Sequence, residues 1–279
     1  MRVLFATDGA EPSERAGELL TRIADPTRTR ILVLSVNDFD VAMRQAQRSG
    51  RYSTEAGHEA ARRAVEAGLE QLRQAGLAEL DGRVEDGDEA SEIVHAAETE
   101  RFDLVTVGAG PRDRFDIVSL GSVSSSVLYA APCPVLVVRQ APEPGPTVRV
   151  LVGSDGSVGS NHAIASFIAL ADPSRCEVAV VTAVPPLGAD EGPDVAGDAL
   201  VLAHRHAEAA TDDLVDAGFR VEAEVVTGRA APVLLDQVER RGADLVVVGA
   251  RGLGRFESKM LGSVSDLIVR GSRATLVGR

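Results

Sequence analysis

Short apolar runs rich in valine, isoleucine and leucine alternate with longer amphipathic stretches along all 279 residues of the chain. Runs of this kind are typical of parallel strands that crossover helices bury on both faces. The sequence therefore predicts strands at residues 2–7, 29–36, 82–85, 103–108, 134–138, 148–153, 177–184, 220–226, 244–249 and 274–277. The amphipathic stretches Ser53–Ala75 and Asp198–Ala217 predict helices between them.

The two halves of the chain repeat each other. Val3–Gly9 recurs as Val150–Gly156 and Ala24–Pro26 as Ala171–Pro173, each 147 positions later. Asp103–Gly108 recurs as Asp244–Gly249 and Leu120–Ser124 as Leu261–Ser265, each 141 positions later. Four blocks repeated in the same order indicate a duplicated domain.

Closely spaced prolines in Gln140–Thr147 interrupt both helix and sheet, which is typical of a linker. We therefore expect two domains, at residues 1–140 and 148–279. Each is predicted to be an α/β doubly wound domain with a five-stranded parallel sheet in the order 3-2-1-4-5. Sheets of this type bind ligands beyond the carboxyl ends of the strands where the chain order reverses. Asp155 and Gly249 end two such strands, as Asp8 and Gly108 do in the first half.

A glycine-rich loop follows the fourth strand of the second half. It begins at Gly249, contains Gly252 and Gly254, and leads through Gly262 and Ser263 into a helix-like run. Glycines permit close backbone approach, and the free amides of a helix start, with the hydroxyls of Ser263 and Ser265, can donate to phosphate oxygens.

Two common phosphate-binding motifs do not fit this loop. Lys259 is followed by Met260 rather than by Ser or Thr, and no G-x-G-x-x-G follows the strand. A P-loop nucleotidase and a Rossmann dehydrogenase are therefore disfavoured.

The spacing G-x(2)-G-x(9)-G-[ST] of Gly249, Gly252, Gly262 and Ser263, with Asp155-Gly156 after the first strand, resembles the universal stress protein family in its tandem form. This resemblance implies ATP binding, commonly with Mg²⁺. It implies that Gly153, Ser154 and Asp155 line the base and ribose, and that Ala183 or Val184 flanks the adenine. The ribose and phosphates would contact Val248, Gly249, Gly252, Gly262, Ser263 and Val264, and we expect added contacts from Gly254 and charge from Arg251 and Arg255.

The first half departs from this pattern. Pro111 stands where the second half has Gly252, and Asp113 where it has Gly254. A residue of fixed φ and an anion facing phosphate both disfavour nucleotide binding. We therefore expect ATP mainly in the second half.

Composition limits the kinds of binding partner and the location that we expect. The net charge is −13, and no segregated basic face is apparent, so nucleic acid is not an expected partner. Cys133 and Cys176 occupy non-equivalent positions without metal or redox spacing, which suggests buried thiols. With no signal-peptide pattern and no membrane-length apolar stretch, we expect a cytoplasmic protein that does not bind membranes.

Several residues have an ordinary structural interpretation. Gly249 and Gly252 could simply make a tight turn, Asp155 could be a turn residue, and Ser160 is expected to be a helix N-cap. His204 and His206 should point in different directions on a helix, which disfavours a metal site. Pro185–Gly197 is expected to be a surface loop or a lid.

The leading hypothesis is an ATP-binding stress-response or regulatory protein that acts through an unknown protein partner. The alternatives are a nucleotide-independent interaction module and a slow ATP-hydrolysing or adenylate-forming enzyme, although the sequence shows no catalytic constellation. The resemblance also implies that the halves pair through their last strands as an intramolecular pseudo-dimer, with a homodimer as a further option.

Overall fold

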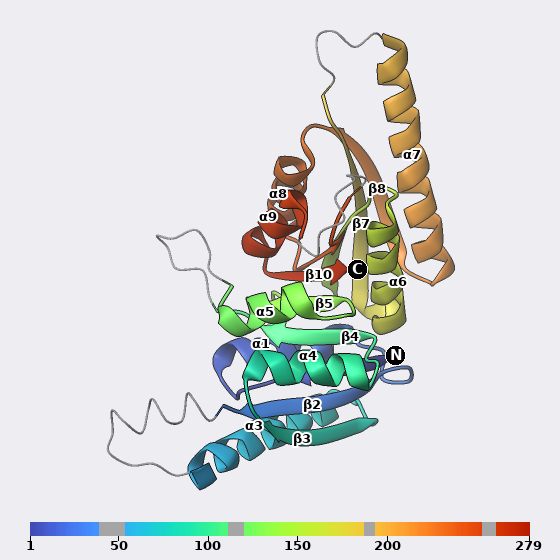
Figure 1. The fold of residues 1–279 in the computed structure, drawn as a ribbon. Coiled ribbons are helices and arrows are strands. Elements are labelled where there is room, and N and C mark those ends of the chain that lie inside the picture. Colours follow the sequence, from blue (N-terminus) through green and yellow to red (C-terminus); the bar gives the residue numbers. More distant parts are fainter. Residues whose placement is uncertain (39–53, 111–119, 187–192, 253–260) are drawn as a thin grey trace. The chain divides into compact units, whose positions relative to one another are not determined.

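The computed structural model describes residues 1–38, 54–110, 120–186, 193–252 and 261–279. They form two compact units, Met1–Ala141 and Pro142–Arg279. Each unit has the α/β architecture expected from the sequence, and all the predicted strands are present (Figure 1).

The first unit has five parallel strands and four helices among its described residues. Its strands are β1 (Arg2–Ala6), β2 (Arg30–Asn37), β3 (Leu80–Asp86), β4 (Leu104–Gly108) and β5 (Val135–Val138). Its helices are α1 (Glu11–Ile23), α3 (Thr54–Gln74), α4 (Glu89–Thr99) and α5 (Ser122–Ala130).

The second unit repeats this order of elements. Its strands are β6 (Val148–Gly153), β7 (Cys176–Val184), β8 (Arg220–Thr227), β9 (Leu245–Gly249) and β10 (Ala274–Gly278). Its helices are α6 (Val158–Leu170), α7 (Pro193–Asp216), α8 (Ala230–Arg241) and α9 (Ser263–Gly271), with a short 3₁₀ turn at Pro173–Arg175.

The first strand of each unit lies inside its sheet. In the first unit β1 pairs in parallel with β2 and β4, β2 with β3, and β4 with β5. In the second unit β6 pairs with β7 and β9, β7 with β8, and β9 with β10. The order within each unit is thus 3-2-1-4-5. The chain order reverses between β1 and β4, and between β6 and β9, which places a crevice at their carboxyl ends.

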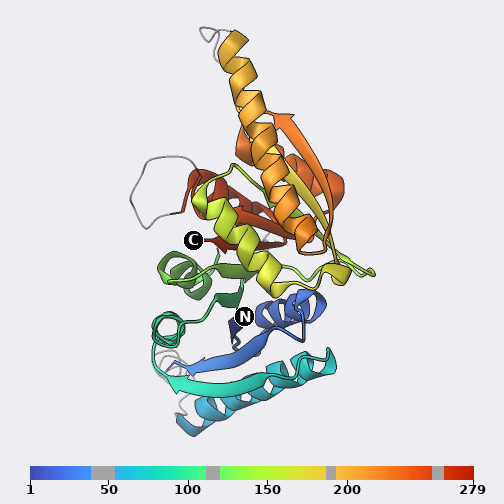
Figure 2. The same ribbon diagram turned by 90° about the vertical axis from the view of Figure 1, so that its right-hand side faces the viewer.

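Helices cover both faces of each sheet, which explains why the central strands are almost entirely apolar, whereas the edge strands β3 and β8 are more exposed and carry charged residues. In the second unit α6 and α7 pack on one face, while α8 and α9 pack on the other (Figure 1). The long helix α7 covers β7 and β8 (Figure 2). Both cysteines are buried, as predicted.

The loop predicted at Pro185–Gly197 is partly wrong. Helix α7 already begins at Pro193, because proline fits the first turn of a helix, where its missing N–H has no intrahelical partner. Residues 187–192 of that segment lie outside the described residues.

Candidate functional site

A cavity of about 100 Å³ lies at the carboxyl ends of β6, β7 and β9 in the second unit. We call it the second-unit cavity. Nine residues expected from the sequence line it: Gly153, Ser154, Asp155, Ala183, Val248, Gly249, Arg251, Gly252 and Val264. Val184, Gly262 and Ser263 are outside this lining, and Gly254 and Arg255 lie outside the described residues. The fold thus gathers residues from four separate parts of the second half.

The second-unit cavity also has lining residues that the sequence did not predict. Ser160, Val181, Ala230 and Leu234 also line the cavity, together with Ser265, whose hydroxyl was expected to face phosphate. Ala230 and Leu234 come from the first two turns of α8, far in sequence from the glycine-rich loop. The feature of the sequence that could have indicated these two residues is their i, i+4 spacing at the start of a helix that follows a strand.

The prediction that Ser160 caps a helix is wrong. Ser157 is the N-cap of α6, and its hydroxyl oxygen accepts a hydrogen bond from the Ser160 amide at 3.2 Å. The Ser157 hydroxyl also lies 3.2 Å from the carbonyl oxygen of Arg251, to which it can donate. Ser157 therefore joins the start of α6 to the loop after β9, while Ser160 lies at the buried cavity wall.

The Asp155-Gly156 pair has both a turn role and a cavity role. Gly156 has φ +71°, a left-handed conformation that favours glycine, and the His206 ring of α7 packs against it. Oδ1 of Asp155 accepts from the Ser157 amide at 3.0 Å. Oδ2 faces Gly252, where an added Cβ would lie only 2.4 Å from it. Asp155 thus occupies the junction between the two loops.

Gly249 is required by packing, whatever else it does. A Cβ at this position would lie 2.5 Å from the carbonyl carbon of Gly159 and from the amide nitrogen of Ser160. The Ser265 hydroxyl donates to the Gly249 carbonyl oxygen at 2.6 Å. The hydroxyl of Ser265, expected to face phosphate, therefore holds the start of α9 against the end of β9.

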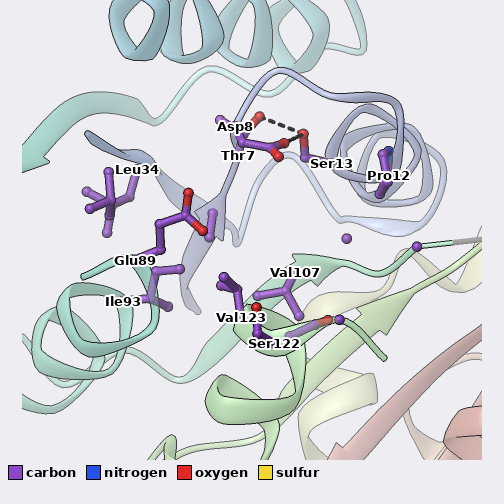
Figure 3. Close-up of a pocket in the computed structure, with 16 residues that line it drawn as sticks. Thr7, Asp8, Pro12, Ser13, Leu34, Glu89, Ile93, Val107, Ser122 and Val123 are labelled. Carbon is purple, nitrogen blue, oxygen red and sulfur yellow. Dashed lines mark hydrogen bonds between the residues drawn. The ribbon is translucent and has the colours of Figure 1, made fainter. Parts of the chain in front are cut away.

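The first unit has a cavity of about 250 Å³ at the corresponding place, which we call the first-unit cavity (Figure 3). Its residues match the second-unit cavity through the 147- and 141-residue offsets, for example Asp8 with Asp155. Two substitutions change its chemistry. Glu89 stands where the second unit has Ala230, and Gly110 stands where it has Arg251.

The first-unit cavity therefore contains two carboxylates, Asp8 and Glu89. The Ser13 hydroxyl donates to Asp8 at 2.8 Å (Figure 3). Burial raises the pKa of Glu89 above its ordinary value, and the negative charges of Asp38, Asp8 and Asp88 raise this pKa further. The carboxylate of Glu89 thus lies in a partly desolvated and acidic environment.

Two features are absent from the residues that the structure describes. No group of three or more His, Cys, Asp or Glu side chains among them is placed to hold a metal ion. None of the helices within the described ranges combines the length and apolarity needed to cross a membrane.

Comparison with known proteins identifies the family. The model of the universal stress protein family matches residues 1–139 and again residues 147–277. The chain belongs to the universal stress protein family. The two matches establish the tandem arrangement that the sequence repeat predicted.

Named relatives agree with this assignment. Universal stress protein Rv1996 of Mycobacterium tuberculosis is 26% identical over 304 residues, which cover 99% of this chain and 93% of that protein. Universal stress protein Rv2005c of the same organism is 32% identical over 185 residues, which cover 63% of this chain and 61% of that relative. The chain thus matches about three fifths of the length of Rv2005c.

A solved structure shows the same fold. The crystal structure of a universal stress protein from Archaeoglobus fulgidus has a TM-score of 0.71 and 22% sequence identity, and the match covers 100% of this chain and 98% of that chain. At this identity the likeness supports the fold of the tandem chain.

Proposed function

We propose that this protein is an ATP-binding regulatory member of the universal stress protein family, with the nucleotide held mainly by the second unit. The observation that carries the proposal is the second-unit cavity, where Asp155 and the loop residues Gly249, Arg251 and Gly252 converge at the switch point of the sheet. The choice of ATP among nucleotides rests on the family resemblance of the glycine-rich loop.

The start of α9 suits the phosphates. Its N-cap, Gly262, provides no side-chain acceptor, so the first-turn amides, including those of Ser263 and Val264, remain available to an anion. Gly153 and Ser154 would face the ribose, and Ala183 the base. The cavity volume is below the roughly 300–1,000 Å³ of typical ligand pockets, so it would enclose only part of a nucleotide.

Cavity size favours nucleotide binding in the first unit, whereas charge favours it in the second unit. Charge is the stronger effect. The first-unit cavity is larger, at about 250 Å³ against about 100 Å³. However, a like-charge pair at 4 Å costs about 4 kcal/mol at an effective dielectric constant of about 20, and less where water screens it. Glu89 would repel a triphosphate in the first unit, whereas Arg251, exposed at the mouth of the second-unit cavity, would attract it.

Mg²⁺ would arrive with the nucleotide rather than occupy a protein cage. Asp155 is the single carboxylate among the described residues that line the second-unit cavity. Mg²⁺ is usually held by one or two carboxylates together with substrate phosphates and water. Asp155 therefore fits as one ligand, and the ion would offset part of the phosphate charge.

Calorimetric titration with Mg-ATP, after removal of co-purified nucleotide, tests the proposal. The wild type should bind about one ATP per chain, and Gly252→Asp should abolish binding because its carboxylate would lie against Asp155. Gly110→Ala is a control in the first unit, since a Cβ at this lining position meets nothing within 4 Å. Absence of wild-type binding would refute the proposal and leave a nucleotide-independent interaction module. Full binding by Gly252→Asp would refute the assignment of the nucleotide to the second unit.

Nucleotide occupancy would act by changing the surface presented to a protein partner. This part of the proposal follows from the position of Ser157, which links the loop after β9 to the start of α6. Ligand contacts with that loop would therefore reach the start of α6, whose Ser160 lines the cavity, and through it the rest of that helix. Hydrogen-exchange mass spectrometry with and without Mg-ATP should show increased protection in α6, and unchanged exchange there would contradict this route.

A further inference from the structure

The first-unit cavity has an apolar body with an acidic side. Its apolar wall consists of Ala6, Leu34, Val36, Ile93 and Val107. Asp8 and Glu89 line the same cavity, and the side chain of Glu89 is drawn with Leu34 and Ile93 in Figure 3. Concave, mainly apolar cavities with a few converging polar groups are the usual form of small-molecule sites.

Glu89 lies at the start of α4 but is not its cap. Asp88 is the N-cap, and its carboxylate accepts from the Ser91 amide at 2.9 Å. The side chain of Glu89 makes no hydrogen bond or ion pair with another of the described residues, whereas Oδ1 of Asp8 accepts from the Ser13 hydroxyl and the Ala10 amide. The Glu89 carboxylate is therefore the group in the cavity best placed to bind a ligand atom.

The surroundings of Glu89 are negative. Asp8, Asp38 and Asp88 all act on it electrostatically. Arg139 is buried and donates to the carbonyl oxygen of the lining residue Gly110 at 3.2 Å, but it does not itself line the cavity.

Among the described residues that line the first-unit cavity, Asp8 and Glu89 carry negative charge and none is Lys, Arg or His. These charges favour a ligand with a positive group.

We propose that the first-unit cavity is a binding site for a small organic cation, with a protonated amine against Glu89 and Asp8 and an apolar body against Leu34 and Ile93. The apolar wall favours an organic ion over a hydrated metal ion, because a hydrated ion would leave this wall without an apolar partner. This site does not depend on nucleotide binding by the second unit. The two units of the tandem chain would then detect ligands of opposite charge.

Three probes of similar shape test the proposal: 2-phenylethylamine, 2-phenylethanol and 3-phenylpropionate. They share an aromatic body and carry a cation, a neutral hydroxyl and an anion. Ligand-observed NMR titrations of the full chain at low salt should give the tightest binding for the amine. We expect roughly a tenfold advantage over the alcohol, the order expected of one charge-assisted hydrogen bond, and the weakest binding for the carboxylate.

Two variants assign the effect to the cavity. Glu89→Gln keeps the size of the side chain and should remove most of the advantage of the amine over the alcohol. Glu98→Gln is the control, because Glu98 is an exposed carboxylate of the same helix outside the cavity, and it should behave like the wild type.

Three results would overturn the proposal. They are an amine that binds no better than the alcohol, an unchanged preference in Glu89→Gln, and no binding of any probe. Mg-ATP titration of Glu89→Gln separates this test from the nucleotide proposal. It should still give one site per chain if the second unit alone holds ATP.

Discussion

Replacing Gly249 by alanine tests whether packing, rather than phosphate contact, requires this glycine. The added Cβ would lie 2.5 Å from the Gly159 carbonyl carbon and from the Ser160 amide nitrogen. Both are backbone atoms in the first turn of α6, so neither can move away by a side-chain rotation. The end of β9 and the start of α6 would have to separate.

The expected loss of stability follows from this overlap. Overpacking of a tight contact costs roughly 1–3 kcal/mol. One kcal/mol lowers the Tm of a domain the size of the second unit by roughly 4 °C, so the Tm of this unit should fall by about 4–12 °C. Differential scanning calorimetry of the nucleotide-free protein measures this change without interference from binding.

Gly252→Ala is the matched comparison. Its Cβ would lie 2.4 Å from Oδ2 of Asp155, which is a side-chain atom that can rotate aside. We expect a stability loss below about 1 kcal/mol, together with weaker Mg-ATP binding because Asp155 is displaced. A Gly249→Ala protein as stable as the wild type would refute the packing argument. Equal destabilisation by the two variants would refute the distinction between the two glycines.

Three further predictions concern other residues. Burial would raise the pKa of Asp244, but hydrogen bonds from the Arg149 side chain and from two backbone amides outweigh burial and lower this pKa. The stability that the ionised Asp244 gives to the folded protein should therefore be lost as the pH falls below about 5. Urea unfolding of Asp244→Asn should therefore show lower stability at pH 7 and a flatter acid dependence. Ala230→Glu, which copies Glu89 into the second-unit cavity, should weaken Mg-ATP binding at least about tenfold by calorimetry, and unchanged affinity would contradict the charge argument. Ser157→Ala should lower the stability of the second unit by about 1 kcal/mol through loss of the N-cap, measured by urea unfolding.

The sequence alone was sufficient for the fold because the relevant signals are local or repeated. Strands buried on both faces must be apolar along their whole length, so runs such as Leu245–Gly249 mark them directly. The duplication confirmed each assignment a second time, and Asp155-Gly156 marked a turn that only glycine adopts easily. The loop residues that follow a strand were placed near the cavity by the general rule for doubly wound sheets.

Only the tertiary structure decided which distant side chains share a cavity and which glycines are required by packing. Ala230 and Glu89 lie on helices that follow the third strands, and the side of the sheet to which their first turns are directed is not encoded in any local pattern. Ser160 looked like a cap because the sequence offers several hydroxyls near the start of α6, and only the geometry assigns that role to Ser157. The close approach of Gly249 to α6 likewise arises from two segments about 90 residues apart, because packing depends on distances in space rather than on spacing along the chain.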